Sequence, residues 1–148
     1  MPMPKKPRTN CLQCGKEPAR SRYKYCSNKC QTDFQYGAFI RSWQAGEILG
    51  LQRLGVVSRH IKRYLREKYD DECCLCGWSV KNPVTNMVPL VADHIDGDWR
   101  NNQEDNLRLV CPNCDALSPT YAGLNIGKGR KDRKVSNRVI AARKLTSQ

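Results

Sequence analysis

The chain has 148 residues, and lysine plus arginine outnumber aspartate plus glutamate by 26 to 14, which gives a formal net charge of +12. No apolar run approaches the roughly 20 residues that a bilayer span needs, so the composition excludes a membrane protein. The excess of positive charge attracts polyanions, of which nucleic acid is the commonest in a cell, and a merely solubilising surface is the alternative.

The N-terminal segment, residues 1–10, combines three prolines with three basic side chains. It lacks the apolar core of a secretory signal, which argues for a protein of the cytoplasm. We expect this segment to be a flexible basic lead-in without fixed structure.

Cysteines dominate the pattern of the chain, and eight of the nine fall in close pairs: Cys11/Cys14, Cys26/Cys30, Cys73/Cys76 and Cys111/Cys114. Two thiolates separated by two or three residues bind one tetrahedral ion from a single turn, and two pairs fill its four positions. A reducing cytoplasm disfavours a disulfide framework. We therefore predict two structural zinc sites. Cys74 is left over as a buried or bystander thiol.

Residues 11–46 predict a small zinc-finger module with four cysteine ligands. Gly15 follows the second thiolate, as the tight backbone of a zinc knuckle favours, and Tyr23 and Tyr25 alternate as in a short strand. Ser27 is placed to cap a helix that runs to the end of the module. This order of knuckle, hairpin and helix resembles treble-clef zinc fingers.

Residues 47–57 are punctuated by glycine and predict a linker. Residues 58–69 then predict an amphipathic helix with Ile61 and Leu65 on its apolar face. Basic side chains cover the rest of this helix: Arg59, Lys62, Arg63 and Arg66. Those arginines are either functional or only a solvated face. His60 has no acidic or cysteine neighbour at ligand spacing, which favours a surface or packing role.

The next segment predicts an α+β zinc unit. The first two of its cysteines precede an apolar run at 87–92, which is interpreted as a strand that leads directly into Asp93. After a loop rich in asparagine and aspartate, residues 107–110 predict a second strand, and 111–114 begin a helix. The expected order is strand, loop, strand and helix, clamped by zinc.

The C-terminal extension, residues 127–148, carries eight positive charges against the single acid Asp132. Such density favours an extension that follows phosphates. Its predicted nucleic-acid contacts are Lys128, Arg130, Lys131, Arg133 and Lys134. Apolar positions from 135 to 142 predict a later helix within it.

Four short motifs stand in a characteristic order: Cys-Cys-Leu-Cys-Gly-Trp at 73–78, Asp-His-Ile-Asp-Gly-Asp at 93–98, Asn-Leu at 106–107 and Cys-Pro-Asn-Cys at 111–114. Together they resemble the HNH endonuclease family, particularly its zinc-stapled members from bacteriophages and mobile elements. The resemblance covers about residues 61–130 and implies a ββα-metal nuclease domain at 58–126. It also implies hydrolysis of phosphodiester bonds in DNA with a divalent cation, in a bacterial or phage-infected cell.

The resemblance also implies roles for individual residues. His94 matches the general base, and an imidazole suits this role because it exchanges protons near neutral pH. Asp93 matches the metal-binding carboxylate, and Asn106 the asparagine that braces the loop and helps to hold the histidine. Asp115 stands where the family usually has His or Asn. A second carboxylate favours Mg²⁺ or Mn²⁺, and an inactivated copy is the alternative.

Other polar residues near the motif receive simpler interpretations. Asp96 and Asp98 flank a glycine, and turn stabilisation is favoured over metal ligation. Four further residues are predicted to contact phosphate or substrate: Arg100, Arg108, Tyr121 and Asn125.

Two other functions fit part of the pattern. A non-catalytic, zinc-dependent DNA-binding protein fits the charge and the cysteines, but it leaves the Asp93-His94 pair unexplained. A zinc protein that binds RNA or another protein fits the charge as well. One catalytic centre per chain favours nicking, and a homodimer would be needed to cut both strands.

Overall fold

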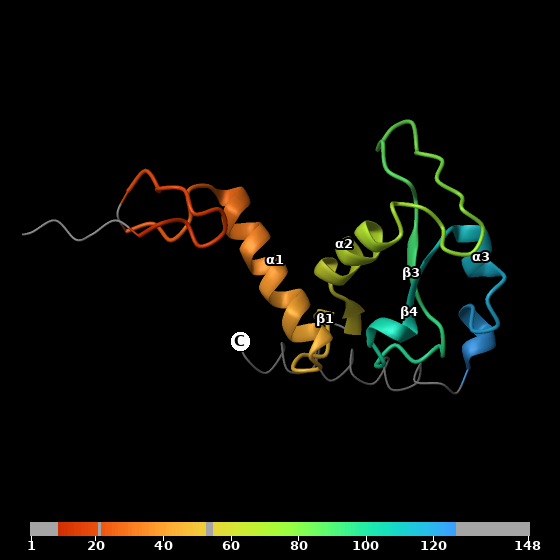
Figure 1. Cartoon of the computed structure of the whole chain (residues 1–148). Helices are drawn as coiled ribbons and strands as arrows, with labels where there is room; N and C mark the ends of the chain where they lie inside the picture. The colour runs from red at the N-terminus through yellow and green to blue at the C-terminus, as the bar shows by residue number, and fades with distance from the viewer. Residues whose placement is uncertain (1–8, 21, 53–54, 127–148) are drawn as a thin grey trace, which may run out of the picture. The chain divides into compact units, whose positions relative to one another are not determined.

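The computed structural model describes residues 9–20, 22–52 and 55–126. The chain divides into two compact units, residues 1–42 and 43–148, and each is described by itself (Figure 1). Within the described ranges, every helix is too short or too polar to cross a bilayer. Most of the predicted basic lead-in and five predicted nucleic-acid contacts lie outside the described residues: Lys128, Arg130, Lys131, Arg133 and Lys134.

The first unit opens with a cysteine knuckle. The backbone N–H of Gly15 donates to the Cys11 carbonyl at 2.9 Å, and the N–H of Cys11 donates to the Lys16 carbonyl at 2.8 Å. The strand predicted around Tyr23 and Tyr25 is wrong, because the described residues 22–27 form no strand. Instead of pairing in a ladder, this segment packs on the following helix, where the ring centroid of Tyr25 lies 5.5 Å from that of Phe34.

Helix α1 spans Asn28–Gln44. Its predicted cap is confirmed, because the Ser27 hydroxyl accepts a hydrogen bond from the backbone N–H of Cys30 at 3.1 Å. The helix begins in the first unit, and its last two residues belong to the second. One of them, Trp43, is 5% exposed, so it belongs to the core of the second unit.

A short hairpin occupies the predicted linker. Strands β1 (Leu51–Gln52) and β2 (Val56–Val57) pair antiparallel, with Leu51 opposite Val57. Gly50 precedes the hairpin with φ +67°, and a Cβ atom there would lie 2.4 Å from the Ile61 side chain. Gly50 is therefore packed into the second unit, and glycine at this position serves close approach rather than flexibility.

Helix α2 spans Arg59–Lys68, as the amphipathic pattern predicts, and the Ser58 hydroxyl caps it by accepting from the His60 N–H at 3.2 Å. Ile61 and Leu65 are completely buried. Three of its cationic side chains are held by acids of the same unit, in the pairs Arg63–Glu67, Arg66–Asp71 and Lys68–Glu104. These pairs favour a structural role for this part of the basic face.

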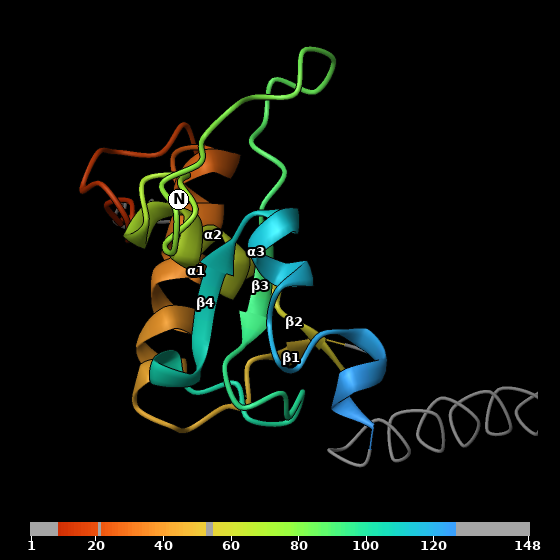
Figure 2. The same cartoon turned by 90° about the vertical axis from the view of Figure 1, so that its right-hand side faces the viewer.

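The second sheet contains strands β3 (Val91–His94) and β4 (Leu107–Val110), which run antiparallel and side by side (Figure 2). The second strand is confirmed. The first begins at Val91 rather than at residue 87, because Pro89 has no N–H to donate to a ladder. Three short helices complete this unit. Helix η2 (Glu104–Asn106) lies directly before β4, α3 (Pro112–Ala116) follows β4, and η3 (Ala122–Asn125) follows α3.

The core of the second unit lies around β4. Leu107, Leu109 and Val110 are almost fully buried, α2 packs against this strand, and α3 packs against β3 (Figure 1). The result is a small mixed α and β domain in which β3 and α3 are in contact.

Candidate functional site

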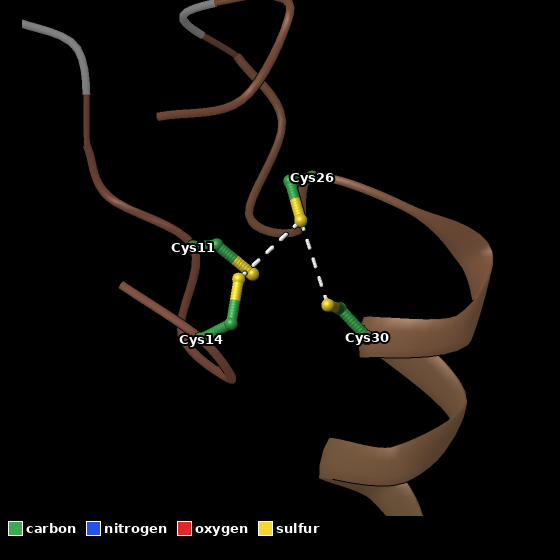
Figure 3. Close-up of side chains that lie close together, drawn as sticks. All are labelled: Cys11, Cys14, Cys26 and Cys30. Carbon is green, nitrogen blue, oxygen red and sulfur yellow. Dashed lines mark hydrogen bonds between the residues drawn. The ribbon is translucent and has the colours of Figure 1, made fainter. Parts of the chain in front are cut away.

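The first metal-binding cluster consists of Cys11, Cys14, Cys26 and Cys30. Their sulfur atoms all lie within 4.8 Å of one another, and Figure 3 shows the four side chains converging on one point. The Sγ–Sγ distances are 3.4 Å for Cys14–Cys26 and for Cys26–Cys30. A Zn–S bond of about 2.3 Å gives a tetrahedron with an edge of roughly 3.8 Å, so the spacing suits zinc and is too long for a disulfide.

The second cluster repeats this arrangement with Cys73, Cys76, Cys111 and Cys114. The sulfur atoms of Cys76 and Cys111 lie 3.8 Å apart. Cys111 caps α3, where its sulfur accepts from the Cys114 N–H at 3.4 Å. Cys74 takes no part in the cluster. The geometry of both quartets supports the two predicted structural zinc sites.

The four thiols of each quartet lie close enough to shift one another's pKa. Burial opposes ionisation of the Cys11 thiol, but backbone N–H donors of Cys14 and Cys26 lower its pKa to about 6. In the other quartet, the hydrogen bonds that the Cys114 thiol donates to Cys76 and Cys111 raise the pKa of Cys114 to about 12. One thiolate therefore holds its neighbours in the thiol form until a divalent ion replaces their protons.

The carboxylate of Asp93 lies directly across the sheet from Arg108, since the two residues are paired in the β3–β4 register. Arg108 Nη2 and Nε lie 2.7 Å and 2.8 Å from the same oxygen, Asp93 Oδ2. Both side chains are mostly buried, at 13% and 19% exposure. Arg108, a predicted phosphate contact, is therefore engaged by the predicted metal ligand.

Asp115 joins this pair from α3. Burial raises the pKa of its carboxyl group, the negative charge of Asp93 raises it further, and Arg108 opposes the shift. Two carboxylates that repel each other electrostatically attract a hard divalent cation. Among the described residues, three or more metal-ligating groups converge only in the two cysteine quartets.

His94, the predicted general base, has different surroundings from its neighbour Asp93. Successive side chains of a strand point to opposite faces, and the Nε2 atom of His94 lies 2.9 Å from Asn102 Oδ1. Asn102 is 4% exposed. The structure thus brings Asp93 and Asp115 together and places His94 at the loop that connects the two strands.

Asn106 holds that loop in shape. Its side-chain oxygen accepts from the Asp96 N–H at 3.0 Å, and its Nδ2 donates to Asp96 Oδ1 and to the Asn101 carbonyl, both at 2.8 Å. These hydrogen bonds have the geometry of the predicted loop brace. The direct partner of the histidine is Asn102 instead.

Asp96 and Asp98 occupy turn positions. The N–H of Asp98 donates to Asp96 Oδ1 at 2.8 Å, and the N–H of Arg100 donates to Asp98 Oδ1 at 3.0 Å. The Arg100 guanidinium also binds Asp98 and lowers the pKa of that carboxyl group. The turn interpretation fits this geometry, and Arg100 is oriented by Asp98.

Asn125 supports the same loop from η3. Its Nδ2 donates to the Gly97 carbonyl at 2.6 Å, and a Cβ at Gly97 would lie 2.6 Å from Asn125 Oδ1. Gly97 has φ +75°, so only glycine fits this contact without strain. Asn125 therefore positions the loop, whereas Tyr121 is 44% exposed beside it.

Comparison with known proteins adds one partial match. The chain is 47% identical over 57 residues to the H-N-H endonuclease F-TflIV of Escherichia phage T5. The resemblance to HNH endonucleases is confirmed. The matched stretch covers 38% of this chain and 24% of the phage protein. No family model matches the chain, and no solved structure matches it.

The HNH resemblance did not reveal Asn102. This residue lies inside the loop between the histidine and asparagine motifs, next to Asn101 and close to Asn106. Nothing in the local sequence separates Asn102 from Asn101, because only the folded loop aims its amide at His94. The one sequence signal that could have pointed to Asn102 is the high number of asparagines in this loop.

Proposed function

We propose that the protein is a metal-dependent HNH endonuclease that hydrolyses phosphodiester bonds in DNA. The observation that carries the proposal is that Asp93 and His94 are neighbours on β3, and that the charge of Asp93 acts on Asp115 of α3. The partial match to a phage H-N-H endonuclease supports the same activity. In this proposal, the second unit has the ββα-metal fold.

Asp93 and Asp115 would hold Mg²⁺ or Mn²⁺, which are hard cations that prefer carboxylate oxygen. When bound, such an ion neutralises negative charge on the phosphate during its displacement. Asp93 is suited to this role because Arg108 holds its Oδ2 atom and fixes the orientation of the carboxylate. The two zinc ions are structural, since four thiolates leave no open position for water.

The proposed reaction uses His94 as the general base. Its imidazole removes a proton from a water molecule, and the water oxygen forms a bond to the scissile phosphorus as the bond to the 3′ oxygen breaks. The departing 3′ oxygen takes a proton from solvent, and the imidazolium later returns its proton to solvent. The products are a 5′-phosphate and a 3′-hydroxyl.

Basic side chains would hold the DNA backbone. Arg100 and Arg108 lie in the second unit near the proposed centre, and the net charge of +12 favours a polyanionic substrate. The cationic positions beyond residue 126 belong to the same proposal.

A nicking assay tests the function. Zinc-loaded protein is incubated with supercoiled plasmid, with and without added Mg²⁺, and compared with His94→Ala. We expect Mg²⁺-dependent nicking that falls about 10²- to 10⁴-fold in the variant, with zinc content and DNA affinity unchanged. Equal nicking by His94→Ala would contradict the assignment of the general base.

A second candidate function is DNA binding without cleavage, and the first unit favours it. Tyr23 is 43% exposed, and the guanidinium groups of Arg20 and Arg22 each lie 5.8 Å from the centre of its ring. An adjacent hollow of about 450 Å³ is lined by Arg22, Lys24 and the N-terminus of α1. Exposed aromatic and cationic side chains of this kind bind nucleic acid. Tight binding with no nicking in Mg²⁺ or Mn²⁺ would favour this function.

A further inference from the structure

We propose that Asn102 is a positioning residue that fixes the tautomer of His94, with the proton on Nε2 and the lone pair on Nδ1. The inference rests on the proposed function for its catalytic meaning, because it identifies Nδ1 as the atom that accepts the proton from water. The placement of the proton itself follows from the hydrogen bonds of Asn102.

The orientation of the Asn102 amide is determined by two backbone carbonyls. Its Nδ2 donates to the Trp99 carbonyl at 3.0 Å and to the Arg100 carbonyl at 3.2 Å. Carbonyl oxygens only accept, so exchanging the amide nitrogen and oxygen would place three acceptors against one another. The atom that faces His94 is therefore Oδ1.

The protonation of the imidazole follows from this orientation. Asn102 Oδ1 is an acceptor and lies 2.9 Å from His94 Nε2, so this nitrogen must carry the hydrogen. A neutral imidazole carries one such hydrogen, which leaves His94 Nδ1 unprotonated. A partner that binds one ring nitrogen in this way sets both the tautomer and the orientation of the ring.

The backbone of Asn102 is fixed as firmly as its side chain. The indole N–H of Trp43 donates to the Asn102 carbonyl at 2.7 Å in a buried position. Trp43 is itself packed edge-on against Tyr64, with ring centroids 5.5 Å apart. Asn102 is thus held at its carbonyl and at its amide nitrogen, and its one remaining acceptor is directed at His94.

Asn102 and Asn106 therefore have different roles in the loop. Asn106 binds Asp96 and the Asn101 carbonyl and shapes the turn, whereas Asn102 binds the histidine ring. Loss of Asn102 would leave the loop braced but would release the imidazole to rotate or to change tautomer. This difference separates a positioning role from a merely structural one.

Nitrogen NMR of the two histidine side chains tests the inference directly. The chain has two histidines, so a His60→Gln variant assigns both imidazole signals. Spectra are recorded on zinc-loaded protein without Mg²⁺ at about pH 8, where an ordinary imidazole is neutral. We expect the wild-type His94 signal to show a proton on Nε2. A proton on Nδ1 would overturn the proposal without any variant of Asn102 being needed.

Two variants then test the role of the amide. In Asn102→Ala, we expect a mixture of His94 tautomers and nicking reduced about 10- to 100-fold, with DNA affinity and zinc content unchanged. The matched control is Gln103→Ala, which removes an exposed amide from the adjacent position and should behave as the wild type. A variant Asn102→Ala that keeps the single tautomer and the wild-type rate would overturn the proposal.

The same experiment separates this inference from the proposed function. A wild-type protein with the proton on Nε2 that nicks no DNA supports the placement of the proton and overturns the nuclease assignment. If Asn102→Ala does not fold, as loss of bound zinc would reveal, the wild-type spectrum alone decides the placement.

Discussion

Arg108 and Asp93 form an ion pair across β4 and β3 in which both Nη2 and Nε of the guanidinium bind the single oxygen Oδ2. The Arg108 guanidinium therefore places a positive charge next to the carboxylate that is proposed to bind the cation. It keeps one carboxylate oxygen engaged and leaves Oδ1 as the natural ligand atom. A cation that binds at Asp93 must therefore do so against the field of Arg108.

The first prediction concerns this competition. Replacing Arg108 by Gln removes a positive charge within about 3 Å of the carboxylate, so Mn²⁺ should bind the DNA-free protein about fivefold or more tightly. Nicking should nevertheless fall, since a proposed phosphate contact is lost. Calorimetry with Mn²⁺ measures the affinity. Arg100→Gln, whose partner is Asp98, is the matched control, and an unchanged Mn²⁺ affinity in Arg108→Gln would contradict the prediction.

We expect each cysteine quartet to bind and lose its zinc ion independently of the other. Metal analysis should find two zinc ions per chain, and Cys14→Ser and Cys111→Ser should each lose one. All three tryptophans lie in the second unit, so their fluorescence reports on that unit alone. Cys14→Ser should keep the wild-type emission, whereas Cys111→Ser should shift it toward that of the unfolded chain. An identical shift in both variants would show that the zinc sites are not independent.

Packing between α2 and β4 should dominate the stability of the second unit. Leu65 is completely buried, so Leu65→Ala should lower the free energy of unfolding by about 2 to 5 kcal/mol. Leu117 is 84% exposed, and Leu117→Ala should change the free energy of unfolding by less than about 0.5 kcal/mol. Urea denaturation of the zinc-loaded proteins measures both values. Similar losses for the two variants would exclude α2 as the main packing element.

The Glu104 network gives a prediction for pH. Hydrogen bonds from Lys68 and Tyr64 lower the pKa of Glu104 from 4.5 to about 2 against the opposing effect of burial. A carboxyl group whose pKa is lowered by folding stabilises the folded state at pH values above its pKa in the unfolded chain. This stabilisation is lost as the pH falls toward the pKa of the group in the folded protein. Glu104→Gln should therefore cost about 1 kcal/mol throughout pH 5 to 8.

Thermal denaturation of the wild type and of Glu104→Gln at several pH values measures this difference. The gap should stay constant down to about pH 5 and begin to shrink only below about 4.5, since Glu104 becomes protonated in the unfolded chain first. Both proteins must retain zinc at each pH compared. A gap that closes between pH 8 and pH 5 would assign the effect to another group.

Local patterns in the sequence were sufficient for several features. The spacing of cysteines identified both quartets, because two or three residues between thiolates suit one metal ion wherever the pair occurs. Ser27 was predicted as a cap and Ile61 with Leu65 as a buried face, and both predictions are confirmed. The helix cap, the buried face and each cysteine pair depend on residues within one or two turns of each other.

Other expectations failed where distant residues compete with local preference. Tyr25 packs on Phe34 instead of extending a strand. The strand before the active motif begins at Val91, after the proline that cannot join a ladder. In each case, tertiary packing outweighs a weak local propensity.

By itself, the sequence indicated the two cysteine quartets, the order of strand, loop, strand and helix around the second one, and the motifs that resemble HNH endonucleases. Only the tertiary structure decided that Asp93 faces Arg108 and Asp115, and that His94 binds Asn102 rather than Asn106. The physical reason is that a motif fixes which groups are present, whereas strand register and loop folding fix which of their atoms meet.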